Sequence, residues 1–322
     1  MESWKANRKS RDIFYEKFLG IDEKGFEQNL AHTAAKYTST YGRLPKKEIK
    51  RAFQSIYGYI ETHMNPVYMD GDSYKSRGFK SSYAMQAILL QSQTQSASLD
   101  DKQKYFIIMS ETFALGKKEI TRMSKDLSVH INLHSAKRFI ERMDNEAFLE
   151  ALGKFAFEIA LFLVVYNEVC KRAKTKHYNV FIPFADGVFL GQTEIARMLT
   201  GSYITEWVAR TNGSVENNSK THPGDFYSVP WMYNVGLKTF IDPALLKRGQ
   251  RRLFYRIKRV LDWNREVISH FAKVSLFKTG RVGDHMTETE FKKCNEVIEE
   301  LVGIILSDEY KNVAGHENDQ SR

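Results

Sequence analysis

Two apolar stripes at helical spacing dominate the beginning of the chain. Both place apolar residues three or four positions apart, which is typical of one face of an amphipathic helix. The first stripe consists of Leu19, Phe26, Leu30, Ala34 and Tyr37, and the second of Ile49, Phe53, Ile56, Tyr57 and Ile60. Pro45 lies just before the second stripe, where proline suits a helix start. We predict that residues 1–66 form a helical region.

Polar residues replace this pattern over residues 67–99. Ser, Gln, Tyr and Gly are frequent in "MDGDSYKSRGFKSSYAMQ" and "QSQTQSASLDD", a composition typical of loops. Between these ends, "SYAMQAILLQ" is compatible with a short helix. We therefore predict a polar linker or loop region at a domain boundary.

Strand-like and helix-like segments follow. The stretches "KYFIIMSETFALG" and "LSVHINL" indicate strands, and Ser135 is placed to cap a helix "AKRFIERM". A long helix is expected from Asn145 to about Thr175. Its most apolar run, Phe155 to Tyr166, spans twelve residues and contains Glu158, whereas a membrane helix needs about 20 residues. We expect a buried helix rather than a membrane span.

A hairpin is the clearest strand signal. "YNVFIPF" and "VFLGQTEI" flank Asp186-Gly187, a dipeptide that favours a tight type I′ turn, so Asp186 is interpreted as a turn residue without catalytic or metal-binding chemistry. Gly191 indicates a bulge or a close backbone approach. Two more strands, "SYITEWVART" and "WMYNVGLKTFI", are expected around a loop.

Helices are expected again from Pro243 to about Lys273 and from Thr287 to Leu306, before a disordered tail at residues 311–322. This order of elements favours an α+β fold over alternating βαβ units. We predict a helical N-terminal region and a core domain, residues 100–310, in which long helices flank an antiparallel sheet.

The charge of the chain narrows the possible partners. The 322 residues carry a formal charge of +9, which favours an acidic partner such as nucleic acid. Residues 1–60 contain twelve Lys/Arg and seven Asp/Glu, so a small helical DNA-binding unit and a solvated basic face are both open there. Residues 247–281 contain eleven Lys/Arg and only Asp262 and Glu266 as acids, so the basicity is concentrated in one helical segment.

This basic segment is the predicted nucleic-acid interface. A helix from Pro243 would bury Leu253, Ile257 and Val260 and expose arginines with Tyr255 on its other side. Such a stripe can follow a phosphate backbone. The residues expected to bind nucleic acid are Arg248, Arg251, Arg252, Arg256 and Arg259, with Arg210 and Lys238 on later strands. RNA is favoured over DNA, and an acidic partner protein or a solvated face remain alternatives.

Histidines and arginines meet in "VHINLHSAKRFIERM". Four-residue steps put His134, Arg138 and Arg142 on one helix face, and His130 approaches from the preceding strand. Imidazoles can transfer protons and guanidiniums can neutralise a phosphate, so this set suits metal-independent RNA cleavage. The alternative is a solvated helix face whose apolar residues point inward.

The segment "HSAKRFIERM" resembles the His-x-x-x-Arg-x-x-x-Arg helix of colicin D-like and RelE-like ribonuclease toxin domains. The resemblance implies catalytic roles for His134, Arg138 and Arg142, with groups on later strands completing the site. Candidates for those groups are Arg210, Thr211, Lys238 and Thr239.

The sequence gives little support for a disulfide framework, a metal site or a cofactor site. Cys170 and Cys294 are isolated from each other and from Cys/His clusters, so we expect neither a disulfide framework nor a zinc site. No metal or cofactor is expected, and the charged N-terminus does not resemble a signal peptide. We therefore expect a cytoplasmic protein of a bacterial or mobile-element system. It would bind nucleic acid and act as a toxin-like or defence-related endoribonuclease, or serve as a non-catalytic regulatory adaptor.

Overall fold

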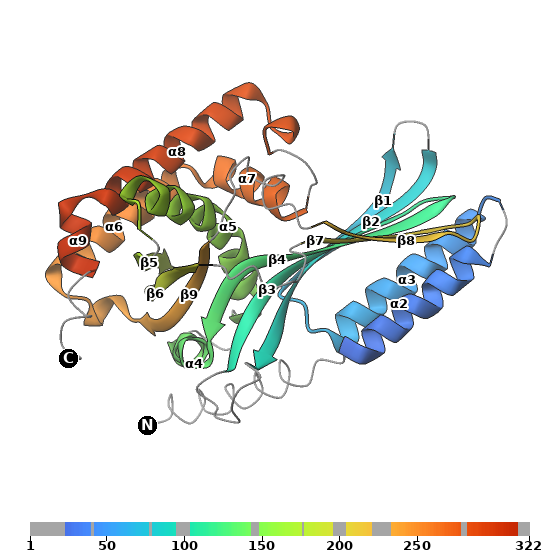
Figure 1. Ribbon diagram of the computed structural model, residues 1–322, viewed down its shortest axis with the longest axis horizontal. Helices are drawn as coiled ribbons and strands as arrows, with labels where there is room; N and C mark the ends of the chain where they lie inside the picture. Colours follow the sequence, from blue (N-terminus) through green and yellow to red (C-terminus); the bar gives the residue numbers. More distant parts are fainter. Residues whose placement is uncertain are drawn as a thin grey trace.

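The computed structural model describes residues 23–39, 42–76, 79–94, 104–142, 148–175, 177–195, 204–220, 233–277 and 282–314. Over these ranges the chain forms N-terminal helices, a curled and mostly antiparallel sheet, and C-terminal helices (Figure 1). The predicted α+β class is confirmed.

Two antiparallel helices, α2 (Glu23–Thr38) and α3 (Lys46–His63), lie side by side at one end of the sheet (Figure 1). Their apolar stripes face inward: the buried members are Phe26, Leu30, Ala34, Tyr37, Ile49, Ile56 and Ile60. The two helices are therefore confirmed. Leu19 and the rest of residues 1–22 lie outside the described residues.

The polar stretch after α3 forms strands, so the expectation of loops around a short helix is wrong. Strands β1 (Tyr68–Ser76) and β2 (Phe79–Thr94) pair as an antiparallel hairpin at the edge of the sheet. The apolar run in β2 has core on both faces, because Ala87 and Leu89 belong to one buried cluster and Ile88 and Leu90 to the other. Burial on both faces removes the alternation of apolar and polar residues by which a strand is recognised in a sequence.

Strand β4 (Glu119–Asn132) organises the middle of the sheet. One of its edges pairs with β3 (Lys104–Leu115). The two strands predicted for this part of the chain are therefore confirmed. Its other edge is divided between two strands. β7 (Ile204–Arg210) runs antiparallel to the first half of β4, and β9 (Tyr233–Ile241) pairs in parallel with residues 129–131. β8 (Val215–Lys220) pairs with β7 where a loop was expected.

The predicted hairpin is confirmed as β5 (Asn179–Phe184) and β6 (Gly187–Ile195), but its turn is shifted by one residue. Phe184 pairs with Gly187, so Ala185 and Asp186 form the turn, and Ala185 has a φ of 48°. Gly191 lies at a register shift, and a Cβ atom there would overlap the carbonyl oxygen of Gly236 on β9. Both the bulge and the close approach are confirmed.

Helix α4 (Leu133–Arg142) begins directly after β4. Its first turn includes Ser135, which is fully buried, so the prediction that Ser135 caps this helix is wrong. The side-chain oxygen of Asn132 instead accepts a hydrogen bond from the backbone N–H of His134 at 2.7 Å. An asparagine at this position satisfies one of the free amides of a helix start.

The remaining helices pack at the other end of the molecule (Figure 1). Asn264 divides the expected helix after Pro243 into two. A last helix continues through residues 311–314, where a disordered tail was expected. Residues 315–322 of that tail lie outside the described residues. The elements are α5 (Phe148–Ala173), η2 (Pro243–Leu245), α6 (Arg248–Trp263), α7 (Arg265–Phe277), η3 (Val282–His285), α8 (Glu288–Leu306) and α9 (Asp308–Ala314).

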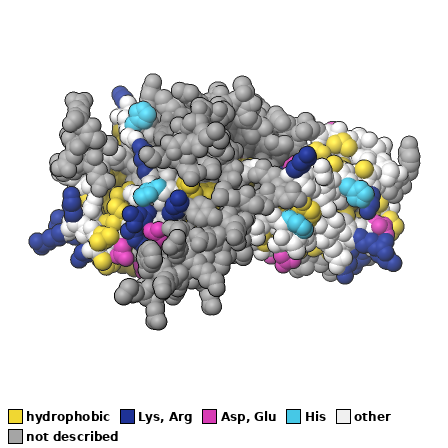
Figure 2. All heavy atoms as spheres, turned by 90° about the horizontal axis from the view of Figure 1, so that it is seen from below, with side chains coloured by type: hydrophobic (Ala, Val, Ile, Leu, Met, Phe, Trp, Pro, Cys, Tyr) yellow, Lys and Arg dark blue, Asp and Glu magenta, His cyan; other side chains and the backbone are white. Residues whose placement is uncertain are grey.

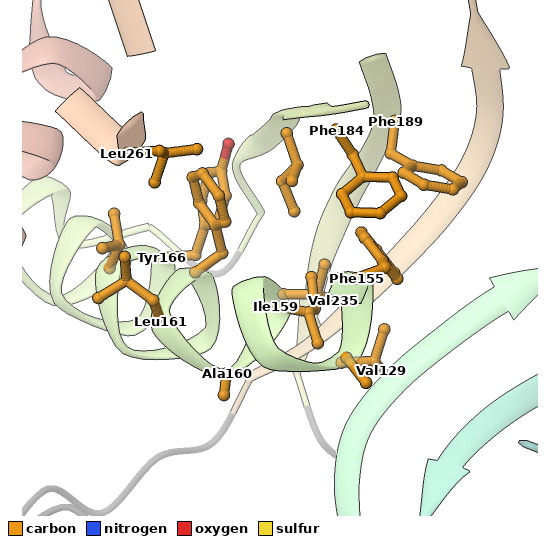
Figure 3. Close-up of a cluster of buried hydrophobic side chains, with 14 of the residues drawn as sticks. Val129, Phe155, Ile159, Ala160, Leu161, Tyr166, Phe184, Phe189, Val235 and Leu261 are labelled. Carbon is orange, nitrogen blue, oxygen red and sulfur yellow. The ribbon is translucent and has the colours of Figure 1, made fainter. Parts of the chain in front are cut away.

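Two buried clusters cover the sheet. The larger one surrounds α5, and Figure 3 shows Phe155 pointing toward Phe184 and Phe189, with ring centroids 5.0 and 4.6 Å away. The smaller one packs α2 and α3 against the first strands of the sheet. No helix within the described ranges is long and apolar enough to cross a membrane.

Candidate nucleic-acid interface

Helix α6 separates apolar from basic side chains. Leu253 and Ile257 are fully buried in the larger core, as the sequence predicts. The other side of the helix is exposed to solvent and carries arginines at steps of three and four residues. The exposed residues of this side are Arg248, Arg252, Tyr255, Arg256, Arg259 and Trp263, which together are called the α6 face below.

Two other basic residues of α6, Arg251 and Lys258, form hydrogen bonds to neighbouring parts of the chain. Arg251 donates from Nη2 to the carbonyl oxygens of Ala244 and Leu246, at 3.4 and 3.3 Å, and so joins the helix to the preceding turn. Lys258 donates to the carbonyl oxygen of Ala185 at 2.8 Å, across to the β5–β6 turn. These contacts separate Arg251 from the α6 face, although it is one of the arginines predicted to bind nucleic acid.

An acidic residue borders the α6 face. Glu309, in α9, lies 3.3 Å from Nη1 of Arg256 and 3.9 Å from Nε of Arg252. Both arginines are exposed, so these ion pairs are screened by solvent and each contributes at most about 1 kcal/mol. The positive potential of the face is therefore reduced beside α9 and greater toward Arg248, for which the described part of the chain contains no hydrogen bond or ion pair.

Two aromatic side chains project from the same face. Tyr255 is 59% exposed and Trp263 is 74% exposed. The guanidinium of Arg259 lies 5.2 Å from the centre of the Trp263 ring, within the range of a cation–π interaction. Tyr255 is among the residues predicted to lie on this face, whereas Trp263 is not, although its position four residues after Arg259 places it there.

The histidine set lies elsewhere, where β4 meets α4. His130 is half-buried on β4, and its ring centroid is 4.7 Å from that of Tyr105 on β3. Burial raises the pKa of nearby Asp126, while a hydrogen bond from the Ser128 amide and the proximity of His130 lower it. His134 is exposed in the first turn of α4.

The two arginines of α4 already have partners within the protein. Arg138 lies 3.6 Å from Glu141, one turn along the helix. Arg142 donates from Nη1 to the carbonyl oxygen of Phe240, which ties the end of α4 to β9. Burial and the proximity of Arg138 lower the pKa of Arg142. Arg142 therefore holds the end of α4 against β9, whereas the pair of Arg138 and Glu141 stays within the helix.

Lys238 is the later-strand residue nearest to His130 in the sheet register. His130 pairs with Gly236, which pairs in turn with Gln192 of β6, so these residues share one face of the sheet. Its Nζ donates to Gln192 at 3.1 Å, and its side chain is exposed. This bond to Gln192 places Lys238 on that face, and Lys238 lies at the register shift between β6 and β9, directly before Thr239.

Arg210 and Thr211 lie at the far end of the sheet. Arg210 pairs in register with Glu119, eleven residues before His130 on β4, which corresponds to roughly 35 Å of strand. Its guanidinium contacts Glu119 and Glu216, and the hydroxyl of Thr211 donates to the carbonyl oxygen of Gly42. The expected convergence of Arg210 with His134 is therefore absent.

Figure 2 shows Lys and Arg side chains gathered at both ends of the face that it draws, over the C-terminal helices with α4 and over α2 with α3.

Cys170 and Cys294 are free and buried. Among the residues with assigned positions, no group of three His, Cys, Asp or Glu side chains could hold a metal ion.

A charged network around Arg122 is a second polar feature, and it is not predicted from the sequence. Arg122 of β4 donates from Nε and Nη2 to the carboxylate of Glu111 at 3.0 and 3.1 Å, and from Nη1 to Glu27 of α2 at 2.8 Å. Ser124 also donates to Glu111, at 2.6 Å. Burial lowers the pKa of Arg122, but the two carboxylates raise it by more. These side chains line a cavity of about 180 Å³ between α2 and the sheet.

Comparisons of the chain with protein-family models, with curated proteins and with solved structures find no match.

Proposed function

We propose that the protein binds nucleic acid, with RNA favoured over DNA, through the α6 face. The observation that carries this proposal is the alignment of four exposed arginines, Arg248, Arg252, Arg256 and Arg259, along one side of a helix whose other side is buried. Guanidinium groups form paired hydrogen bonds with phosphate oxygens. A rigid helix therefore presents several phosphate-binding groups in one line.

The proposal predicts a strong dependence of affinity on salt. Each phosphate contact that releases a counterion adds about 0.7 to 0.9 to the slope of log affinity against log salt concentration. Four such contacts would weaken binding about 50- to 150-fold between 50 and 200 mM salt. Fluorescence anisotropy with a labelled 20-nucleotide RNA measures this slope directly.

A charge-matched pair of variants tests the location of the interface. Arg248→Gln/Arg252→Gln/Arg256→Gln removes three positive charges from α6, and Lys46→Gln/Lys47→Gln/Lys50→Gln removes three from the exposed side of α3. The first variant should weaken RNA binding more than tenfold and reduce the salt slope by about 2 to 3. The second should change both quantities little.

Two results would contradict the proposal. One is an equal loss of RNA affinity in both triple variants, because it would indicate attraction by net charge alone. The other is binding that does not respond to salt. If the α6 variant instead loses the binding of acidic polypeptides such as polyglutamate while RNA never binds, the face serves an acidic partner protein.

Metal-independent RNA cleavage is the second candidate function. It is favoured by the placement of His130 and Lys238 on one face of the paired strands β4 and β9, beside the helix that carries His134. A neutral imidazole could accept the proton of a 2′-hydroxyl and a protonated imidazole could supply one to the leaving oxygen. Arg138 lies beside the carboxylate of Glu141 and Arg142 is half-buried against β9. Lys238 is exposed and is bonded to the neutral side chain of Gln192, so it is the group proposed to neutralise the phosphate.

Incubation of RNA with the purified protein in EDTA tests cleavage. His130→Ala, His134→Ala and Lys238→Ala should each abolish or strongly slow it, whereas His63→Ala, at an exposed histidine of α3, should leave the rate unchanged. Absence of cleavage by the folded wild-type protein, with RNA binding retained, would leave a non-catalytic nucleic-acid-binding protein.

A further inference from the structure

We infer that the α6 face takes single-stranded nucleic acid in preference to a duplex and that Tyr255 and Trp263 stack against unpaired bases. The inference rests on the proposed function, which requires only that phosphates bind to the arginines. It adds a ligand class, because arginines alone accept the backbone of either form.

The aromatic rings are exposed on a helix that buries its other large apolar side chains. Phe254, the neighbour of Tyr255, is 2% exposed, whereas Tyr255 is 59% exposed. The edge of one ring faces the other at a centroid distance of 5.1 Å and an angle of 79°, so Phe254 supports the orientation of the Tyr255 ring. Tyr255 therefore presents a supported aromatic surface among arginines.

The spacing of the two rings suits a strand with accessible bases. Tyr255 and Trp263 are eight residues apart in α6, which corresponds to about 12 Å along the helix axis and an angular offset of about 80° around it. Successive bases of a stacked strand are about 3.4 Å apart, so the two rings would engage bases that are not adjacent. Arg259 lies between them in sequence and on the same face.

The geometry of Arg259 strengthens the site at Trp263. Its guanidinium covers the indole ring at 5.2 Å, which leaves the remaining surface of this highly exposed side chain for a base. Stacking on an aromatic ring tolerates any base, because every base has a flat π surface. In a duplex these surfaces are hidden within the stack of base pairs, so neither ring could reach them.

Binding of a 20-nucleotide single-stranded RNA and of its blunt duplex tests the inference. The wild-type protein should bind the single strand at least tenfold more tightly. Tyr255→Ala and Trp263→Ala should each weaken single-strand binding by about 5- to 150-fold and leave duplex binding nearly unchanged. Tyr255→Phe and Trp263→Phe, which keep an aromatic ring, should retain most of the affinity. Binding should also quench tryptophan fluorescence in the wild type, and Trp263→Phe should remove most of this change.

The outcomes separate the inference from the proposed function. Equal binding of the single strand and the duplex, with both alanine variants unaffected and the arginine variant impaired, would overturn the inference and leave the proposed function in place. Failure of every nucleic acid to bind would overturn both. A preference for the single strand that disappears in the alanine variants would support the inference.

Discussion

Nη1 of Arg256 lies 3.3 Å from the carboxylate of Glu309, which places a negative charge beside the arginines of α6. The position of Glu309 is secured by its neighbour Tyr310, whose hydroxyl donates to the carbonyl oxygen of Asn179 at 2.7 Å. The side-chain amide of Asn179 donates in turn to the carbonyl oxygen of Ala314 at the end of α9. These bonds hold the backbone that carries Glu309, and its carboxylate would oppose the proposed binding of phosphate.

We predict that Glu309→Gln strengthens RNA binding about 3- to 10-fold at 0.1 M salt, because it removes a like charge near the bound phosphates that is worth about 1 kcal/mol. Glu61→Gln, which makes the same charge change at an exposed position on α3, is the control and should alter affinity less than twofold. Anisotropy titrations measure both. Equal effects of the two variants would contradict a local role for Glu309.

The network around Arg122 should contribute strongly to stability. Arg122→Ala leaves the carboxylate of Glu111, 4% exposed, without its main partner. Loss of one partner of a buried ion pair typically costs about 3 to 5 kcal/mol, so urea denaturation should show a decrease of this size in the free energy of unfolding. Glu27→Gln changes the exposed end of the same network and should cost less than about 1 kcal/mol. Similar losses in the two variants would show that burial does not distinguish the two contacts.

Glycine at position 191 should be required by packing. In Gly191→Ala the new methyl group would overlap the backbone of Gly236, forcing β6 and β9 apart. Overpacking of this kind costs about 1 to 3 kcal/mol or more. Gly303→Ala is the opposite case, because a Cβ in α8 meets no atom within 4 Å. Alanine there should stabilise the protein by about 0.5 to 1 kcal/mol, and thermal unfolding would show melting temperatures shifted in opposite directions.

Glu158 should make stability depend on pH. Burial, aided by Asp262, raises its pKa from 4.5 to about 7 in the folded protein, against the opposing effects of Arg265 and Lys258. The folded state therefore holds a proton that the unfolded state releases between pH 4.5 and pH 7. By linkage, this group makes stability fall as pH rises through that window, by on the order of 1 to 3 kcal/mol.

In Glu158→Gln this titration is absent. The variant should match the wild type in stability near pH 4.5 and exceed it at pH 8, as measured by urea denaturation at both values. An unchanged difference between the two proteins across this range would exclude Glu158 as the cause.

Local patterns in the sequence predicted the parts of the fold that depend on local contacts. The β5–β6 hairpin and the α6 stripe are examples, because the residues that define each lie within a few positions of one another. β8 was missed because "VENNSK" is polar and occupies a sheet edge, where alternation with the core is weak. The prediction for Ser135 is wrong because α4 begins at Leu133, so Ser135 lies inside the first turn of the helix instead of before it.

The relation between distant residues could not be predicted in the same way. Arg210 lies roughly 35 Å along β4 from His130 because β7 pairs with the first half of that strand, and only the topology determines this. Likewise, Glu111, Arg122 and Glu27 meet across two strands and a helix. Glu111 lies within a strand-like segment, and this was the available signal, because a charged residue in a strand with two covered faces requires a partner.

The divided edge of β4 also has a consequence for local unfolding. β7 with β8 and β9 with β6 and β5 join the sheet through separate stretches of one strand, and Ser128, with a φ of 57°, lies between those stretches. Either group can open while the other keeps its hydrogen bonds to β4. Amide exchange should therefore report two units with different protection, and the amides of β4 that point toward β3 should be among the last to exchange.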